Sequence, residues 1–352
     1  MSSSTGKIFK VTTFGESHGN AVGVVIDGVP PGIPLEVDFI QRELNRRKPG
    51  TSRYVSPRKE SDLAEILSGV SEGKTLGSPL AIMVRNTQAR SKDYENIKDV
   101  FRPGHADYSY FHKYGLSPQP GGGRASGRET VGRVAAGAVA RLVLNPSGIR
   151  IRGFVKSIFN IQGKTVDFNF AESHPVRCAD PDVAALMEQA VLNAQKNGDS
   201  VGGVVEIVID GMPPGLGEPV FQKLDASLGG AFFSIGGVKG VEFGSGFALS
   251  GFKGSSSNDQ ITPDGFESNH SGGILGGIST GQNILARLAI KPTPSIAQTQ
   301  RTVSTQHEPR HINIHGRHDP CICPRIVPVA EAMAAIVIAD AWLTQKSVMR
   351  PE

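Results

Sequence analysis

Short apolar runs alternate along the chain with longer segments in which apolar and polar positions follow a helical period. The short runs are rich in valine and isoleucine, a composition typical of buried strands. They lie at residues 22–26, 80–84, 149–158, 204–209 and 284–290. Each of these segments is therefore predicted to be a strand.

Two helical segments carry start and stop signals. Residues 38–47 begin with Asp38, a suitable N-cap, and have basic residues in the last turn, where the helix dipole favours positive charge. Residues 180–196 begin with Asp180 and a proline and are followed by Asn-Gly, a common way to end a helix. Both segments are predicted to be helices with these ends.

Two further helices are predicted from composition. Residues 128–145 are rich in alanine and valine and contain small residues that permit close packing. Residues 329–346 form the most apolar segment and should be a buried core helix. Because strands and helices mix without strict alternation, the pattern indicates an α+β fold with sheets packed on helices.

One sequence pattern occurs twice. Residues 24–32 read Val-Val-Ile-Asp-Gly-Val-Pro-Pro-Gly, and residues 207–215 read Ile-Val-Ile-Asp-Gly-Met-Pro-Pro-Gly. In each copy a strand run ends in a turn and a helix candidate follows, from Asp38 and from Val220. Coincidence at a common turn is the alternative explanation. We predict a single domain, residues 1–352, with two pseudo-repeats at about 8–198 and 199–345.

Composition and charge narrow the class of protein. The chain has 352 residues, 38% hydrophobic and 20% charged, as in ordinary soluble domains. Its formal net charge of +4 is too small for an extended nucleic-acid surface. Three cysteines cannot form a disulfide framework, and the first residues lack the apolar run of a signal peptide. With no uninterrupted stretch long enough to span a bilayer, we expect a cytoplasmic protein without membrane contact.

Basic residues are concentrated between Arg42 and Lys59, where the only acid is Glu43. A helix face exposed to solvent, followed by a loop, would explain such a run without any function. An anion-binding surface is the other interpretation, and the run alone does not separate the two.

The histidines with the most informative surroundings lie in loops rich in glycine and arginine. His18 lies in Thr-Phe-Gly-Glu-Ser-His-Gly, His105 in Arg-Pro-Gly-His-Ala-Asp, and His318 in Gly-Arg-His-Asp-Pro. Small residues in such loops let a ligand approach the backbone. Proton-transfer groups beside anion ligands indicate an enzyme that acts on a small, highly anionic substrate.

Two loops are candidate anion sites. Residues 121–128 combine three consecutive glycines, Ser126 and two arginines just before a predicted helix. The backbone N–H groups of such a loop and the helix dipole can bind a phosphate. Residues 291–295 place a cation and two hydroxyls on a loop stiffened by two prolines.

Three other motifs do not support the chemistry they suggest. Residues 15–19 match Gly-x-Ser-x-Gly, but they come too early in the chain for the nucleophile elbow of a hydrolase. The Cys-x-Cys sequence at 321–323 lacks the spacing of a zinc site, so no metal is predicted. The Gly-Lys-Thr sequences at 73–75 and 163–165 lack the upstream glycine of a P-loop, so no ATP site is predicted.

Considered in order along the chain, the motifs resemble those of the chorismate synthase family. The resemblance extends from about residue 8 to 345 and rests on segments 12–19, 27–32, 46–53, 101–107, 121–124, 268–270, 272–277 and 316–320. It implies an anti 1,4-elimination of phosphate from 5-enolpyruvylshikimate 3-phosphate, giving chorismate for aromatic amino acid biosynthesis in the shikimate pathway. It also implies reduced FMN as a cofactor without net redox change, a β-α-β sandwich with a duplicated core, and a homotetramer.

The resemblance assigns roles to individual residues. His18 would protonate the leaving phosphate, His105 would protonate or hydrogen-bond reduced flavin on its N1 side, and Asp319 would relay a proton from N5. Substrate anions would contact Ser17, Arg47, Arg53, Arg128 and Arg317. Flavin would contact Arg124, Ala125, Ser126, Gly236, Gly237, Gly276, Lys291, Pro292, Thr293, Pro294, Ser295 and Arg317. These roles would make the basic run functional.

Some flavin positions depart from the usual family pattern. Ala125 and Pro294 stand where serine is frequent, and Gly236 and Gly237 replace an Asn-Ala pair. Backbone contacts survive such changes, whereas side-chain hydrogen bonds are lost. Because the resemblance covers nearly the whole chain, we expect an external flavin reductant, with NADPH acting only indirectly. A non-catalytic flavin- or phosphometabolite-binding protein and a phosphatase are the rival interpretations.

Overall fold

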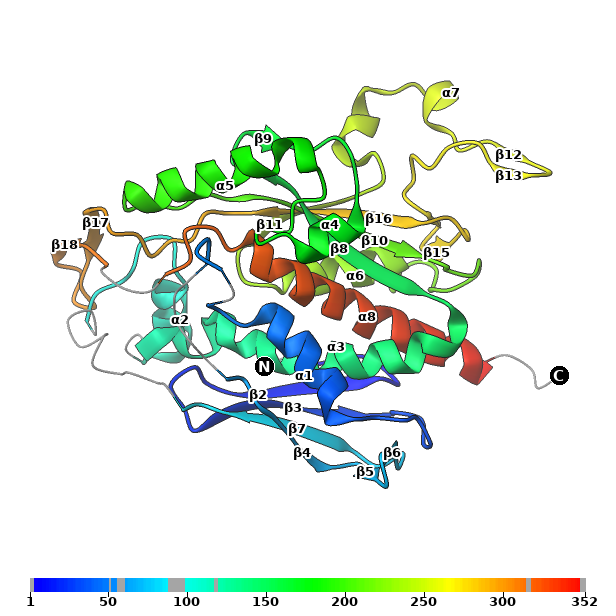
Figure 1. The fold of residues 1–352 in the computed structure, drawn as a ribbon, viewed down its shortest axis with the longest axis horizontal. Helices are drawn as coiled ribbons and strands as arrows, with labels where there is room; N and C mark the ends of the chain where they lie inside the picture. The colour runs from blue at the N-terminus through cyan, green and yellow to red at the C-terminus, as the bar shows by residue number, and fades with distance from the viewer. Residues whose placement is uncertain are drawn as a thin grey trace.

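The computed structural model describes residues 3–50, 52–55, 61–87, 99–116, 120–314 and 318–348. These residues form three layers, with helices between two five-stranded antiparallel sheets (Figure 1). The first sheet has the order β1 (Ser4–Thr5), β2 (Lys10–Gly15), β3 (Ala21–Asp27), β7 (Leu80–Arg85), β4 (Ala64–Ser68). The second has the order β11 (Val238–Phe243), β16 (Ile284–Ile290), β10 (Gly203–Asp210), β8 (Arg150–Ile158), β9 (Ile161–Gln162). The predicted α+β sandwich is confirmed.

The helical layer contains α1 (Val37–Arg47), α3 (Thr130–Leu144), α6 (Leu224–Phe233) and α8 (Cys323–Val348). The helices α3 and α8 pack on each other, α3 also on β3 of the first sheet, and α8 also on β8 and β10 of the second. Their buried side chains and those of both sheets form one continuous apolar core. The helical layer therefore holds the two sheets together.

Other elements lie outside these layers. The helices α4 (Phe168–Ser173) and α5 (Pro181–Lys196) pack on β8 of the second sheet, and α2 (Asp107–Tyr114) lies at one end of the molecule near β17 (Gln300–Val303) and β18 (Pro309–Ile312) (Figure 1). The remaining elements are β5 (Val70–Ser71), β6 (Lys74–Thr75), α7 (Gly254–Ser257), β12 (Ile261–Thr262), β13 (Gly265–Phe266), β14 (Ile274–Leu275) and β15 (Ile278–Ser279).

Each of the five strands predicted from apolar runs is present, as β3, β7, β8, β10 and β16. Strand β2 was not predicted, because its sequence Lys-Val-Thr-Thr-Phe-Gly has few apolar residues. Helix α2 was also not predicted, because only its first residue is buried and it has no long apolar face.

The helix predictions were right in place but partly wrong at the ends. Asp180 caps α5 as predicted, accepting a hydrogen bond from the backbone N–H of Asp182. Asp38 is not the N-cap of α1, because the helix begins at Val37 and Asp38 lies in its first turn. The helix predicted from Val220 begins instead at Leu224.

Helix α8 begins at Cys323, earlier than the predicted start at residue 329, and includes Pro328. Its 26 residues are long and apolar enough to cross a membrane by length and composition, contrary to our expectation that no stretch would be. However, 72% of its most apolar window is buried inside the protein. It is therefore the predicted core helix.

The two sheets share one topology, which supports the duplicated core. Four strands of the first follow the order β2-β3-β7-β4, and four of the second follow β8-β10-β16-β11. In the chain, α1 lies between β3 and β4 just as α6 lies between β10 and β11. Strand β8 belongs to the second sheet, so the sheets divide the chain between α3 and β8 and not near residue 198. The pseudo-repeats themselves stay a prediction.

The two Pro-Pro-Gly turns are held in the same way. Thr75 donates from Oγ1 to the carbonyl of Pro30 at 2.7 Å and accepts from the N–H of Ile33 at 3.0 Å. Ser279 donates from Oγ to the carbonyl of Pro213 at 2.6 Å and accepts from the N–H of Leu216 at 2.9 Å. A buried hydroxyl thus satisfies the backbone of each turn, which the sequence repeat alone did not reveal.

Replacing Gly137 by alanine should lower the free energy of unfolding by about 1–3 kcal/mol, because an added Cβ overpacks the contact between α3 and α8. A Cβ there would lie 2.3 Å from the Cβ of Ala332. Gly230 in α6 is a matched control, since a Cβ at that position meets no atom within 4 Å. Urea unfolding of both variants checks this, and an equal effect at the two positions would contradict it.

Candidate active site

His18 lies in the turn between β2 and β3. Asn86, just beyond β7, donates from Nδ2 to the carbonyl oxygens of Glu16 and Gly19, at 2.9 and 2.7 Å, and so ties the turn to the sheet. Ser17 is buried, and its Oγ lies 3.2 Å from His18 Nδ1. Because a strand, and not a helix, follows this turn, the segment does not have the strand–turn–helix geometry of a nucleophile elbow.

A glycine loop connects His18 with His105. Gly121, Gly122 and Gly123 have φ of 65°, 85° and 51°, in the left-handed region that favours glycine. A Cβ at Gly121 would lie 2.1 Å from His18 Cε1, and a Cβ at Gly122 would lie 3.0 Å from His105 Cε1. The two imidazoles therefore pack against neighbouring residues of one loop.

Arg102, His105 and Asp107 form a buried cluster at the start of α2. His105 Nδ1 lies 2.8 Å from Asp107 Oδ1. Arg102 donates to the same carboxylate from Nε at 2.6 Å and from Nη2 at 2.7 Å. Burial raises the pKa of Asp107, but hydrogen bonds and charge from Arg102 and His105 outweigh burial and hold it well below its ordinary range. The carboxylate is therefore ionised at neutral pH.

Arg47 and Arg128 share one buried carboxylate. Asp62 accepts from Arg47 Nη2 and from Arg128 Nη1, each at 2.6 Å. Burial lowers the pKa of Arg47 to about 10, and Arg325 and Arg128 contribute, while Asp62 opposes the shift. Arg47 thus stays charged at neutral pH. Its Nε is buried with no hydrogen-bond partner in the described part of the chain.

Asp319 is connected to the same arginines. Arg325 donates from Nη1 to Asp319 Oδ2 at 2.5 Å and from Nε to the carbonyl of Arg47 at 3.3 Å. His318 interacts electrostatically with both groups, because burial, Arg102 and His105 lower its pKa while Asp319 opposes them. Asp319 and His105 therefore belong to one charged region.

The loop at 291–295 approaches this region from the second sheet. Lys291 follows β16 and donates from Nζ to the carbonyl of Gly104 and from its backbone N–H to the carbonyl of Gly237, the latter at 2.9 Å. Pro294 lies 3.3 Å from where a Cβ of Gly104 would stand. Thr293 Oγ1 is buried without a hydrogen-bond partner among the described residues. A buried hydroxyl without a partner beside a lysine is suited to bind an anion such as a phosphate.

Some predicted site residues do not join this cluster. Arg53 is exposed and stacks on Tyr54, with Cζ 5.0 Å from the ring centroid. Gly276 lies in the hairpin that precedes β16, whereas Lys291 follows that strand. The seven residues of β16 span roughly 20 Å, which separates the two positions. Figure 1 draws β15 and β17 at opposite ends of the molecule. Arg317 lies outside the described residues.

The polar side chains of the predicted 124–126 segment are engaged in hydrogen bonds within the protein. Arg124 donates from Nη2 to Thr13 Oγ1 at 2.8 Å and from Nη1 to the carbonyl of Gly15 at 3.2 Å, both on β2. Ser126 Oγ accepts from the backbone N–H of Arg128 at 3.3 Å. Ala125 has no polar side chain, so its contacts to a ligand are limited to the backbone. Gly236 lies beside Gly237, just before β11.

The basic run between Arg42 and Lys59 divides into separate parts. Arg47 faces the site, whereas Arg46 donates to Glu331 at 2.6 Å and to Glu172 at 2.8 Å. Glu331 is buried and also accepts from Arg141 at 2.9 Å, so Arg46 belongs to a structural ion network. Arg58 and Lys59 lie outside the described residues. Within the described residues the run is therefore not one anion-binding surface.

Sequence reasoning gave no role to several charged residues of the site. Arg102 and Asp107 stand in the same motif as His105, and an acid two residues after a histidine at a helix start is a usable signal. Asp62 and Arg325 have no such signal. Asp62 pairs with Arg47, 15 residues away in the chain, and Arg325 pairs with Asp319, 6 residues away, but no recognisable motif joins either pair.

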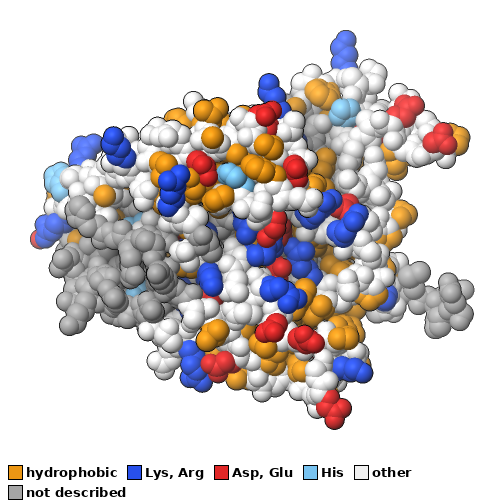
Figure 2. Space-filling model, viewed as in Figure 1, with side chains coloured by type: hydrophobic (Ala, Val, Ile, Leu, Met, Phe, Trp, Pro, Cys, Tyr) orange, Lys and Arg blue, Asp and Glu red, His pale blue; other side chains and the backbone are white. Residues whose placement is uncertain are grey.

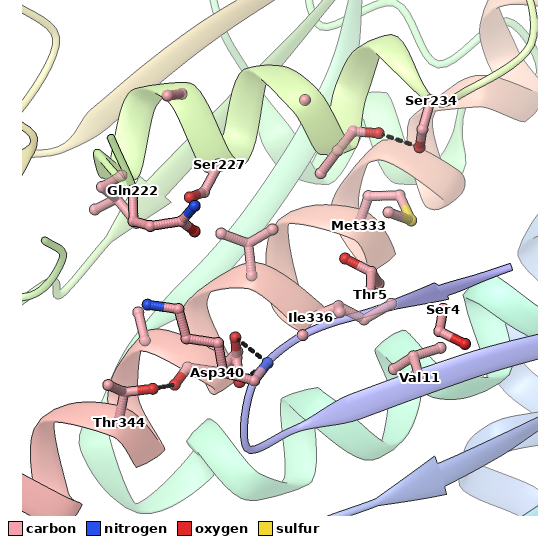
Figure 3. Close-up of a pocket in the computed structure, with 18 of the residues that line it drawn as sticks. Ser4, Thr5, Val11, Gln222, Ser227, Ser234, Met333, Ile336, Asp340 and Thr344 are labelled. Atoms are coloured by element: carbon pink, nitrogen blue, oxygen red, sulfur yellow. Dashed lines mark hydrogen bonds between the residues drawn. The ribbon is translucent and has the colours of Figure 1, made fainter. Parts of the chain in front are cut away.

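One cavity among the described residues is separate from the histidines. It has a volume of about 560 Å³ and lies between the N-terminal strands, α6 and α8 (Figure 3). Asp340 at its edge accepts from the backbone N–H groups of Lys7, Ile8 and Phe9 at 2.7–3.0 Å, which fixes the N-terminal segment. Arg124 is the one predicted site residue in its lining.

The surface shows no extended patch of one sign on the face drawn in Figure 2, where basic and acidic side chains are intermixed among the described residues. This balance agrees with the small net charge of +4.

Comparison with known proteins identifies the family. The family model described as chorismate synthase matches residues 9–343. A chorismate synthase of Syntrophus aciditrophicus is 52% identical over 99% of both chains, and one of Chloroflexus aurantiacus is 54% identical over 97% of this chain and 95% of that protein. A crystal structure of chorismate synthase superposes with a TM-score of 0.75 at 31% identity, covering 97% of this chain and 93% of the other. The chain belongs to the chorismate synthase family, lyases that form chorismate in the shikimate pathway.

Proposed function

We propose that this chain forms chorismate from 5-enolpyruvylshikimate 3-phosphate by anti 1,4-elimination of phosphate, with reduced FMN bound and no net redox change. The observation that supports this most is the packing of His18 and His105 against Gly121 and Gly122. Two groups able to transfer protons thus meet at one glycine loop, and the same loop leads to Arg128. A small ligand bound there could exchange protons with both.

The substrate carries two carboxylates and a phosphate, so it needs fixed positive charge. We assign this role to Arg47 and Arg128, together with Arg53, Arg317 and the hydroxyl of Ser17. Guanidinium groups suit it because they donate two parallel hydrogen bonds to one anionic group. Asp62 neutralises one charge of the Arg47–Arg128 pair and leaves the other for the substrate.

His18, His105 and Asp319 would carry the proton transfers. As the carbon–oxygen bond to phosphate breaks, His18 would donate a proton to the phosphate oxygen, so that a less charged group departs. His105 would hold a proton at the N1 side of bound flavin, and Asp319, on the N5 side, would take up the hydrogen that the substrate ring loses as a proton. General acid–base catalysis of this kind contributes about 10²- to 10⁴-fold for each group.

The residues near Lys291 fit a phosphate-bearing cofactor. Lys291 would pair with the FMN phosphate, and the buried, partnerless hydroxyl of Thr293 and the hydroxyl of Ser295 would donate hydrogen bonds. Pro292 and Pro294 would stiffen the loop, while Gly236 and Gly237 would contribute backbone contacts. The proposed contacts of Arg124, Ala125, Ser126, Gly276 and Arg317 complete the assigned set. When bound, reduced FMN would supply electron density as phosphate departs.

The remaining proposals concern the protein in the cell. We assign it to the cytoplasm, as a homotetramer, and expect an external reductant to supply reduced flavin, with NADPH acting indirectly. Gly276 lies far from Lys291 within one chain, so its flavin contact would have to come from another copy. Size measurement in solution tests the tetramer. Incubation of the protein and 5-enolpyruvylshikimate 3-phosphate with NADPH and oxidised FMN, without air or a second enzyme, tests the need for an external reductant. Chorismate formation in this mixture would contradict that need.

The reaction is tested by mixing the protein with 5-enolpyruvylshikimate 3-phosphate and dithionite-reduced FMN under anaerobic conditions. Chorismate and phosphate should form in equal amounts. Phosphate release without FMN would favour a phosphatase instead. Flavin binding without any product would favour a non-catalytic flavin-binding protein.

Replacing His105 by alanine should lower kcat by about 10-fold or more while FMN still binds, because a proton-transfer group is lost and the cofactor loop is intact. His311, exposed on β18, is a matched control whose alanine variant should keep full activity. Steady-state kinetics and FMN fluorescence titration measure the two effects. Full activity of the His105 variant would remove this residue from the mechanism.

A further inference from the structure

Asp107 is a buried carboxylate to which the proposed reaction assigns no role. It is the first residue of α2, and its side chain is 4% exposed. Its Oδ1 lies 2.8 Å from His105 Nδ1, while Oδ2 lies 2.6 Å from Arg102 Nε and 3.3 Å from the backbone nitrogen of Arg102. The carboxylate therefore connects an imidazole at the glycine loop with a buried guanidinium.

The contact with Asp107 decides which nitrogen of His105 carries its proton. An ionised carboxylate can only accept hydrogen bonds. Two acceptors 2.8 Å apart would repel each other strongly, so Nδ1 must carry a hydrogen and donate to Asp107. Arg102 Nη2 also lies 3.1 Å from this nitrogen, but it donates to Asp107 Oδ1 at the shorter distance of 2.7 Å.

The proton on Nδ1 leaves Nε2 as the reactive nitrogen of the neutral ring. This atom faces the glycine loop, since a Cβ at Gly122 would lie 3.2 Å from it. Gly121, the residue before Gly122, packs against His18. Nε2 is thus directed toward the loop where the second imidazole lies.

We propose that Asp107 is a positioning residue that keeps the proton of His105 on Nδ1 and so presents Nε2 to the reacting molecules, while Arg102 holds Asp107 in place. Arg102 and Asp107 have opposite charges, so the pair orients the ring without adding net charge to the site. The effect on catalysis rests on the proposed function. The orientation of the ring rests on these contacts alone.

Asp107→Asn tests the proposal with little change in shape. The carbonyl oxygen of asparagine should take the Oδ2 position, where two N–H donors of Arg102 point against one at Oδ1, and this turns the amide N–H₂ toward His105. Nδ1 must then accept, and the proton moves to Nε2. Nitrogen-15 NMR of the ligand-free protein should show His105 protonated on Nδ1 in the wild type and on Nε2 in the variant. The proton on Nε2 in the wild type, or no change in the variant, would overturn the proposal.

Kinetics give a second test through a double-mutant cycle. Asp107→Asn should lower kcat for chorismate formation about 10-fold or more and change KM less than about 3-fold. In the His105→Ala background it should have no further effect, because Asp107 acts through His105. Independent losses that multiply would show a structural role and overturn the proposal. Asp182→Asn, in the first turn of α5, is a matched control that should change neither parameter.

The NMR and kinetic measurements test the role of Asp107 and the proposed function independently. If the protein forms no chorismate, the NMR comparison still decides whether Asp107 sets the tautomer. If Asp107→Asn does not fold, Asp107→Glu replaces it. The longer carboxylate should keep the proton on Nδ1, and its appearance on Nε2 would overturn the proposal.

Discussion

Asp62→Asn should lower the free energy of unfolding by about 3–5 kcal/mol, because it leaves buried guanidiniums without their counter-charge. The side chains of Asp62 and Arg47 are 0% and 1% exposed, and that of Arg128 is 5% exposed. Asparagine is the appropriate replacement since it keeps the shape and tolerates the φ of 46° at this position. Urea unfolding at neutral pH measures the effect.

Glu65→Gln is the matched control for the Asp62 variant. Glu65 also pairs with an arginine, Arg85, at 2.9 Å, but both side chains are well exposed. Exposed pairs contribute about 0–1 kcal/mol, so this variant should be nearly as stable as the wild type. Equal losses for the two variants would mean that burial of the Asp62 pair is unimportant.

The ion pairs of Asp62 with Arg47 and Arg128 also predict how the free energy of unfolding depends on pH. Burial raises the pKa of Asp62, but Arg47 and Arg128 outweigh burial and leave it below its ordinary value. A folded-state pKa below the unfolded value, about 3.9, means that the contribution is fully present above that pH and is lost as the pH falls below it. The difference in stability between wild type and Asp62→Asn should therefore shrink below about pH 4.

The parts of the fold that could be predicted from sequence are those with strong local signals. The strand at 284–290 is a continuous apolar run, and its ends match β16. The start of α5 follows from Asp180 and Pro181, because an N-cap and a proline in the first turn act within a few residues. By contrast, β4 has a half-buried sequence, and its pairing with β7 is a long-range contact that no local pattern reports.

The residues of the candidate site also divide into those that could be predicted from the sequence and those that could not. His18, His105 and the glycine loop could be predicted because each lies in a distinctive motif. Asp62 could not, since it lies in an ordinary sequence and its partner Arg47 is on another element. Asp62 becomes the shared counter-ion of Arg47 and Arg128 only when three chain segments fold together. No local sequence pattern reports the distances between those segments. The partners that set charge and orientation at this site were therefore found only in three dimensions.

Gly121→Ala should lower kcat by about 10²-fold or more without removing any reactive group. A Cβ at this position would lie 2.1 Å from Cε1 and 2.3 Å from Nδ1 of His18, so the imidazole must move away. The φ of 65° also disfavours any residue with a side chain. Under the proposed mechanism, a displaced His18 can no longer protonate the leaving phosphate, and the loss should approach that of His18→Ala. Steady-state kinetics with reduced FMN measure both variants.

Gly127→Ala is the matched control for the Gly121 variant. Gly127 lies in the same loop, but a Cβ there meets no atom within 4 Å, and its φ is not positive. Its variant should keep nearly full activity and normal FMN binding. If Gly121→Ala were as active as Gly127→Ala, close contact between His18 and this loop would have no part in the reaction. If instead it lost FMN binding as completely as activity, the loop would serve the cofactor and not the position of His18.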